Sequence, residues 1–185
     1  MTTTHIPNRE EALELLLKYN ETVSLINHAK SVESVMRHIA SILNEDIDKW
    51  GIVGLVHDLD YEKFPDLHCQ KTKEILDEAA WDYEYIRAVL SHGWGMVTDV
   101  EPQSLMEKYL FAIDELTGLV TACILVRPSK SANDLEVKSV IKKWKDKSFA
   151  AGANRDVILQ GTNMLGVELD YLIQLVIDGI KSLEN

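Results

Sequence analysis

The sequence predicts an all-α protein of about eight helices, and three observations support this fold class. Apolar residues recur at spacings of three and four along most of the chain, only 4 prolines and 9 glycines interrupt it, and no alternating apolar–polar run with hairpin turn residues occurs. The 185 residues are 46% hydrophobic and 26% charged, which is typical of one globular domain. We therefore expect a single domain over residues 1–185.

The first four helices are predicted from capping residues and apolar stripes. Asn8 is of a residue type that caps helix starts, and the stripe from Val32 to Leu43 lies on one face of a long second helix. The third segment is apolar almost throughout, as expected for a helix that is buried on all sides. Pro65 is tolerated in the first turn of the fourth helix. These helices are expected at residues 8–19, 23–43, 46–59 and 65–80.

Glycine and proline delimit the remaining helices. The Gly-Trp-Gly sequence at residues 93–95 ends the fifth helix, and Pro128 follows the sixth, which is the longest. The last helix contains Gly161 and Gly166, and either of them is a candidate break. These helices are expected at residues 83–92, 104–126, 135–145 and 154–183.

Charge and cysteine content exclude several classes of protein. The chain has 19 basic and 30 acidic residues and a formal net charge of −11, so a duplex nucleic acid is not an expected partner. Cys69 and Cys123 are too few for a disulfide framework or a cysteine zinc finger. No secretory signal precedes the first helix, and the longest apolar run falls short of the roughly 18 residues that span a bilayer. We expect a cytoplasmic protein without membrane contact.

Six ionisable side chains fall on faces that these helices should bury. An unpaired buried carboxylate or imidazole costs several kcal/mol (roughly 2–7 for a polar group, more for a charge). A lone histidine such as His38 is best interpreted as a core residue bonded to a carbonyl, but six inward groups need a shared partner. A divalent cation supplies one, and imidazole with carboxylate suits Mn, Fe, Zn, Co or Mg. The six residues are His28, His57, Asp58, His68, His92 and Asp114.

The order of four of these residues resembles the HD superfamily of metal-dependent phosphohydrolases. His28 is followed 29 residues later by the pair His57-Asp58, and Asp114 stands on a later long helix. The flanking residues at 27–32 and 54–59 are similar to the family's motifs, and the likeness to an uncharacterised bacterial HD/HDIG-type subgroup extends from Leu25 to about Arg155. The resemblance implies an HD-type helical bundle with a core at about 21–127, followed by a basic segment and C-terminal helices at 128–185. It also implies that these four residues bind a metal.

The resemblance also covers the other two histidines, but the chain differs from the family's motif in one segment. His68 and His92 match extra histidines that hold a second metal in some HD proteins, so the resemblance implies one or two ions; alternatively, they contact a substrate phosphate. Many members read His-Asp-Ile-Gly-Lys where this chain has His-Asp-Leu-Asp-Tyr at residues 57–61. The usual lysine is therefore missing, and Lys63 is the candidate replacement for substrate binding.

The resemblance implies hydrolysis of a small phosphoester, a nucleotide or related phosphorylated metabolite, by a metal-activated water. Asp58 or Asp114 would hold or orient the nucleophile, and Glu62 and Asp66 are candidate acids for the leaving group; alternatively, Glu62 and Asp66 are solvated loop acids. Between Arg127 and Arg155 lie eight basic and three acidic residues. This segment either receives an anionic ligand, with both arginines as phosphate contacts, or is a solvated basic face.

Two other functions remain open for the same residues. Some HD proteins use six such ligands for oxygen chemistry, so a di-iron HD-type oxygenase is the first alternative. A non-catalytic helical signalling or interaction module is the second, although this chain keeps the whole ligand set. The sequence leaves the substrate, the metal and the oligomeric state open.

Overall fold

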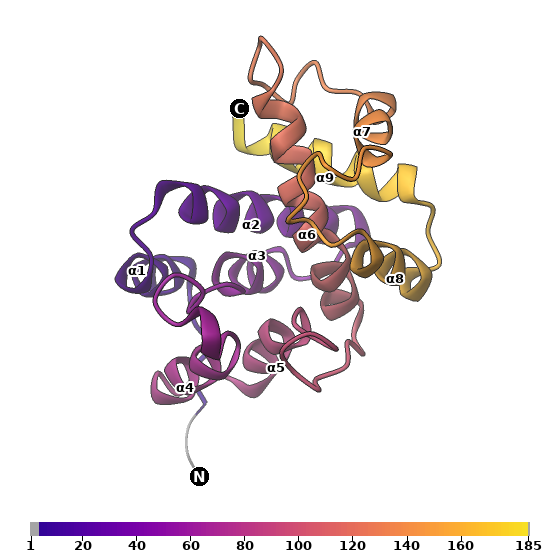
Figure 1. The fold of residues 1–185 in the computed structure, drawn as a ribbon. Coiled ribbons are helices and arrows are strands. Elements are labelled where there is room, and N and C mark those ends of the chain that lie inside the picture. Colours follow the sequence, from indigo (N-terminus) through magenta and orange to yellow (C-terminus); the bar gives the residue numbers. More distant parts are fainter. Residues whose placement is uncertain (1–3, 185) are drawn as a thin grey trace.

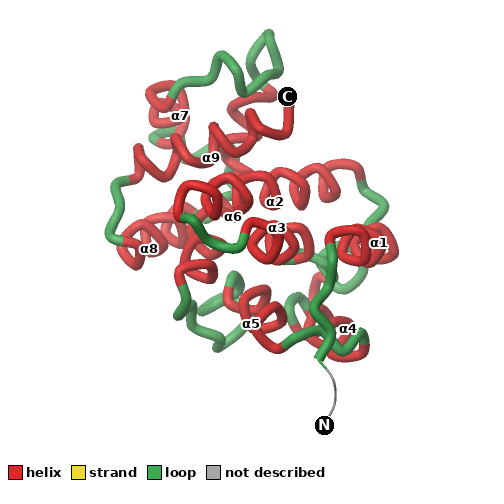
Figure 2. The backbone as a smooth tube through the Cα atoms, turned by 180° about the vertical axis from the view of Figure 1, so that it is seen from behind, coloured by secondary structure: helices red, strands yellow, loops and turns green. Residues whose placement is uncertain are grey.

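The computed structural model describes residues 4–184, and in that range every regular element is a helix, accompanied by two isolated β-bridges (Figures 1 and 2). The prediction of an all-α protein is confirmed. The α-helices are α1 (Arg9–Tyr19), α2 (Val23–Leu43), α3 (Ile47–Val56), α4 (Gln70–Glu78), α5 (Tyr83–Ser91), α6 (Leu105–Leu125), α7 (Val137–Trp144), α8 (Arg155–Leu165) and α9 (Leu169–Glu184), and the 3₁₀ helix η1 covers Pro65–Leu67.

Side-chain caps fix where the helices begin. Asn8 before α1 and Ser104 before α6 each form a capping box, in which the side chain accepts the N–H three residues later and a glutamate returns the bond. Asp46, Asp82 and Asn154 cap α3, α5 and α8 in the simpler way. The predicted helix starts are therefore accurate wherever a capping side chain marks them.

Two expected helices are interrupted where the backbone becomes left-handed. The segment expected to be helical from Pro65 to Ala80 contains η1, a turn at Cys69 with φ +67°, and then α4. The segment expected from Asn154 to Leu183 divides into α8 and α9 at Gly166, whose φ is +66°. A right-handed helix cannot continue through a residue with positive φ, so residues 4–184 form nine α-helices and one 3₁₀ helix in place of the eight helices expected.

The long helix α2 lies in the middle of the molecule. Figures 1 and 2 show it with α3 on one side and α9 on the other, and α6 packs across it. In its apolar stripe, Val32, Met36 and Ile39 are fully buried, and Leu43 at the end is partly buried. Because α3 and α6 both pack on α2, polar side chains on their facing surfaces meet inside the bundle. Among residues 4–184, none of the helices is long and apolar enough to cross a membrane.

Two glycines let helices approach each other closely. A Cβ atom added at Gly161 of α8 would lie 2.6 Å from the Cα atom of Ala112 in α6, and one at Gly179 of α9 would lie 2.6 Å from the Cα atom of Val35 in α2. Both neighbouring atoms belong to the backbone and cannot move without shifting a helix. These glycines are therefore required by packing, although glycine is a poor helix former.

We expect Gly161→Ala to destabilise the protein. Alanine favours a helix by about 1 kcal/mol over glycine, but the added methyl group overpacks the α6–α8 contact, which typically costs about 1–3 kcal/mol. The matched control is Gly118→Ala in α6, where an added Cβ meets nothing within 4 Å, and this change should stabilise. Urea unfolding measures both variants, and equal effects would contradict the close approach of α6 and α8.

Candidate metal centre

Six side chains from widely separated parts of the chain meet at one place in the bundle. Four of the elements involved are helices, and each histidine except the one in α2 stands at the end of a helix. The members are His28 in α2, His57 and Asp58 at the end of α3, His68 after η1, His92 at the end of α5 and Asp114 in α6.

The first group of ligands surrounds the carboxylate of Asp114. Its Oδ1 atom lies 2.9 Å from His28 Nε2 and 3.2 Å from His57 Nε2. Asp58 Oδ2 lies 3.4 Å from the same nitrogen of His57. One ligand atom from each of these four residues lies within 4.8 Å of all the others, which is close enough for a single ion to bind them together.

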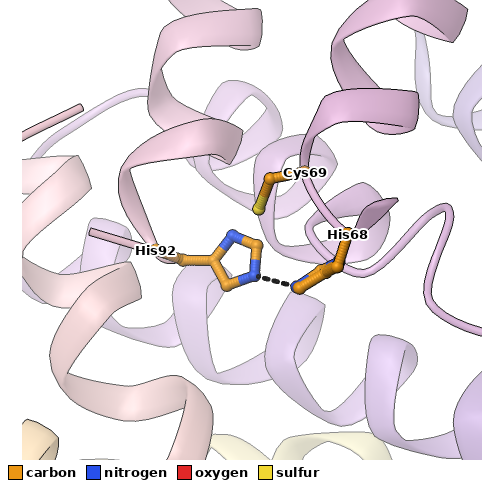
Figure 3. Close-up of side chains that lie close together, drawn as sticks. All are labelled: His68, Cys69 and His92. Atoms are coloured by element: carbon orange, nitrogen blue, oxygen red, sulfur yellow. Dashed lines mark hydrogen bonds between the residues drawn. The ribbon is translucent and has the colours of Figure 1, made fainter. Parts of the chain in front are cut away.

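The second group lies on the other side of Asp58. The Nε2 atoms of His68 and His92 face each other at 3.2 Å (Figure 3), and each lies 3.4 Å from Asp58 Oδ1. Asp58 therefore presents one oxygen to each group. The thiol of Cys69 lies beside these imidazoles, close enough to bind an ion together with them (Figure 3), and burial, followed by the charge of Asp60, raises its pKa.

Backbone carbonyls fix the orientation of two of the rings. His57 Nδ1 lies 2.8 Å from the carbonyl oxygen of Gly54, and His92 Nδ1 lies 2.5 Å from that of Val89. These carbonyls belong to the last turns of α3 and α5, and that of Val89 also accepts the backbone N–H of His92. A carbonyl only accepts, so Nδ1 carries the proton in both rings. Each Nε2 atom therefore directs its lone pair into the cluster.

The cluster requires positive charge at its centre. In the neutral Nδ1–H rings, the Nε2 lone pairs of His57 and of the His68–His92 pair point at carboxylate oxygens or at each other, which is repulsive unless a proton or a metal cation lies between them. Burial lowers the pKa of His57, but Asp58 and Asp114 outweigh it and raise this pKa well above its usual value. Burial likewise raises the pKa of Asp114, yet His57 and His28 bring it far below its usual range. Neutral imidazoles and carboxylates are the donors that divalent cations prefer, so these residues fit a metal.

An open pocket of about 470 Å³ gives access to the cluster. Five of the six side chains line it, whereas His57 is completely buried beneath them. The remaining wall is mostly apolar and small, with one carboxylate, that of Glu115, and one phenol, that of Tyr61. The apolar part consists of Gly93, Met96, Val97, Gly118, Ala150, Gly152 and Ala153.

Three other residues predicted for the site lie outside this pocket. The carboxylate of Glu62 accepts the backbone N–H groups of Glu21 and Thr22 and the Thr22 hydroxyl, and so caps the start of α2. The Lys63 ammonium donates to the carbonyl oxygen of Lys18 at 2.8 Å. Asp66 is exposed on η1. None of the three lines the pocket, so their predicted catalytic and substrate-binding roles gain no geometric support.

The two arginines proposed for phosphate binding already have partners within the protein. Arg127 forms a two-pronged ion pair with Asp134, with the shorter contact at 2.8 Å. The Arg155 guanidinium lies over the ring of Trp144 and donates to five backbone carbonyls. These belong to Trp144, Asp146, Phe149, Ala150 and Ala153, so Arg155 holds the loop that forms one wall of the pocket.

Two acids at the site were not predicted from the sequence. Glu115 follows Asp114 in α6, and its Oε2 atom accepts the N–H of Asn154, the residue that caps α8; burial, with the adjacent Asp114 charge, raises its pKa. Asp60 is buried, and its Oδ1 atom lies 2.7 Å from His68 Nδ1. The departure from the family's His-Asp-Ile-Gly-Lys pattern, which places an acid at residue 60, was the available signal for Asp60.

A divalent cation should stabilise the folded protein through this cluster. An ion at 100 times its dissociation constant adds about 2.7 kcal/mol, which corresponds to a rise of about 5–10 °C in the melting temperature for a chain of this size. Thermal unfolding of chelator-treated protein with and without Mn²⁺ measures the effect. His57→Ala should abolish it and His38→Ala, a histidine outside the cluster, should not; a shift that survives His57→Ala would contradict the assignment.

Arg155→Lys should loosen the loop at the pocket wall. Lysine cannot donate to five carbonyls from one planar group, and each lost bond typically costs about 0.5–1.5 kcal/mol. Hydrogen exchange of the amides at residues 146–153 should therefore accelerate at least tenfold. Arg127→Lys is the control, since it weakens only an exposed ion pair; unchanged exchange in Arg155→Lys would contradict the structural role.

Comparison with known proteins places the cluster in a family. The sequence pattern of the HD domain matches residues 25–119, which include all six members of the cluster. No curated protein and no solved structure matches the chain. The match covers just over half of the 185 residues, and it agrees with the helical fold and with the histidine and aspartate ligands. The chain belongs to the HD superfamily of metal-dependent phosphohydrolases.

Proposed function

We propose that this protein hydrolyses a small phosphoester with the help of two divalent cations. The observation that carries the proposal is the convergence of four histidines and two aspartates at the floor of one open pocket. His28, His57 and Asp114 would hold one ion, His68 and His92 the other, and Asp58 would bridge the two through its separate oxygens. Two-metal hydrolases hold their ions about 3.5–4 Å apart, and a bridging carboxylate is a common means of doing so.

Each residue of the centre has a defined task in this reaction. Cations bound there polarise a phosphoryl oxygen and lower the pKa of water, which makes hydrolysis accessible at neutral pH. Asp58 and Asp114 hold the charge and orient the nucleophile, and the buried His57 keeps the two aspartates apart at fixed distances. Glu115 lines the pocket next to Asp114 and replaces Glu62 and Asp66 as our candidate for delivering a proton to the leaving group.

The pocket wall favours a substrate with a single phosphoryl group. Neither lysine nor arginine lines the pocket among the described residues, so phosphoryl recognition falls to the cations. Its volume of about 470 Å³ lies at the lower end of the range for small-molecule sites, roughly 300–1,000 Å³. The apolar wall around Met96 and Val97 suits an uncharged organic group. We therefore favour a small phosphorylated metabolite, with a nucleoside monophosphate as the largest expected substrate.

The same six ligands also suit a pair of iron ions, so the metal must be identified together with the activity. Metal analysis of the purified protein and a phosphate-release screen over phosphomonoesters and nucleotides distinguish the two chemistries. A preparation that contains Mn or Mg and releases phosphate supports the proposal. An iron-loaded protein with a mixed-valent EPR signal and without phosphate release would support the oxygenase alternative.

Asp58→Ala should abolish phosphate release because it removes the ligand shared by both ions. We expect kcat to fall at least about 10³-fold, in line with the loss of metal-assisted catalysis (several kcal/mol), while the helical circular dichroism spectrum stays close to that of the wild type. The matched control is Asp170→Ala, an exposed aspartate in the first turn of α9. Turnover retained by Asp58→Ala would refute the proposed site.

A further inference from the structure

A buried carboxylate lies directly behind the second group of ligands. Asp60 is 0% exposed, and both of its oxygens are used: Oδ1 lies 2.7 Å from His68 Nδ1, and Oδ2 accepts the backbone N–H of Thr72 at 2.8 Å. Thr72 belongs to the first turn of α4, whose own N-cap residue, Cys69, makes no side-chain capping bond. Asp60 therefore caps α4 from a distance and holds His68 with the same carboxylate.

His68 needs this support more than the other ligands do. His57 and His92 stand at the ends of α-helices, and a carbonyl three residues earlier in the same helix orients each ring. His68 instead follows a single 3₁₀ turn, with an extended ψ of 139°, and its Nδ1 atom meets the carboxylate. An ionised carboxylate only accepts hydrogen bonds, so it keeps the proton on Nδ1 and leaves Nε2 free as a ligand atom.

We infer that Asp60 is a positioning residue that selects the ligating tautomer of His68 and thereby sets the affinity of the His68–His92–Asp58 group for a divalent cation. The inference rests on the proposed two-metal function. It adds that Asp60 sets the affinity for the second ion independently of the first. The side-chain hydrogen bonds of Asp60 go to His68 and to Thr72, and of the six residues of the cluster only His68 receives one, so its influence is directed at the second group. A carboxylate behind a metal-bound imidazole also makes the ring a stronger donor.

The Asp60→Asn substitution changes the hydrogen-bonding groups of the side chain and keeps its size. Its amide has one accepting oxygen and one donating nitrogen, whereas Thr72 N–H and His68 Nδ1–H both need an acceptor. If the oxygen stays with Thr72, the amide donates to His68 Nδ1 and the imidazole proton moves to Nε2, which blocks the ligand atom. If the amide turns over, its NH₂ group opposes Thr72 N–H. This second arrangement keeps the Nδ1–H form of His68 but sets two donors against each other at the start of α4, so we expect the first arrangement, which satisfies every group and weakens the second site at nearly unchanged side-chain volume.

The test compares Asp60→Asn with Asp77→Asn, which removes the same charge from the exposed surface of α4. Calorimetric titration of the chelator-treated full chain with Co²⁺ should give two ions per chain for the wild type and for Asp77→Asn. Asp60→Asn should bind the first ion as the wild type does and the second about 10- to 100-fold more weakly. His68→Ala should lose the second ion, and adding Asp60→Asn to it should cause no further loss.

Nitrogen NMR of the metal-free protein at alkaline pH gives a second readout, since it reports which ring nitrogen carries the proton. We expect the Nδ1–H form of His68 in the wild type and the Nε2–H form in Asp60→Asn. The inference is overturned if Asp60→Asn binds both ions as the wild type does, if it weakens both equally, or if the wild type binds one ion only. Selective loss of the second ion in a protein that releases no phosphate supports the role of Asp60 and contradicts the proposed hydrolase.

Discussion

The carboxylate of Asp58 lies between two groups of imidazoles, and the arrangement around it is unfavourable without added positive charge. One of its oxygens faces His57 and the other faces the His68–His92 pair. Burying such groups costs several kcal/mol each unless they are paired (roughly 2–7 for a polar group), so the surrounding helices must hold them in place. The packing of α3, α5 and α6 supplies that constraint, and a metal centre is its chemical consequence.

Helix ends do much of the positioning. His57 and His92 each place Nδ1 against a carbonyl in the last turn of their own helix, so the ends of α3 and α5 orient two rings of the cluster. The third ring, His68, comes from a connection with no such carbonyl and is held by a side chain instead. A long connection between α3 and α4 thus becomes part of the site through Asp60, which joins the start of α4 to the metal ligands.

The region after α6 contributes a wall of the pocket, and hydrogen bonds to the backbone of this region hold that wall in place. The basic composition of this segment suggested a direct contact with an anionic ligand, but Arg127 is paired with Asp134 and Arg155 is bonded to five carbonyls. The wall formed by Ala150, Gly152 and Ala153 contributes shape rather than charge. In the proposed reaction, the volume and apolar character of that wall would select the substrate, and bound cations would supply the charge.

The sequence by itself determined the helical fold and the six residues of the cluster. Helical spacing and capping residues such as Asn8 and Ser104 act locally, and inward polar groups such as His28 and Asp114 stand out against an apolar face. It did not determine which other acids reach the site, because Asp60 lies in a loop that carries no periodic signal and the place of Glu115 in the pocket wall depends on the elements packed around α6. Only the tertiary structure directed Asp60 towards His68, placed Glu115 in the pocket wall, turned Glu62 to the start of α2 and bound Arg155 to backbone carbonyls. These choices depend on how α6 packs on α2 and α8 and how α4 packs on α5, and that packing is a property of contacts between residues distant in the chain.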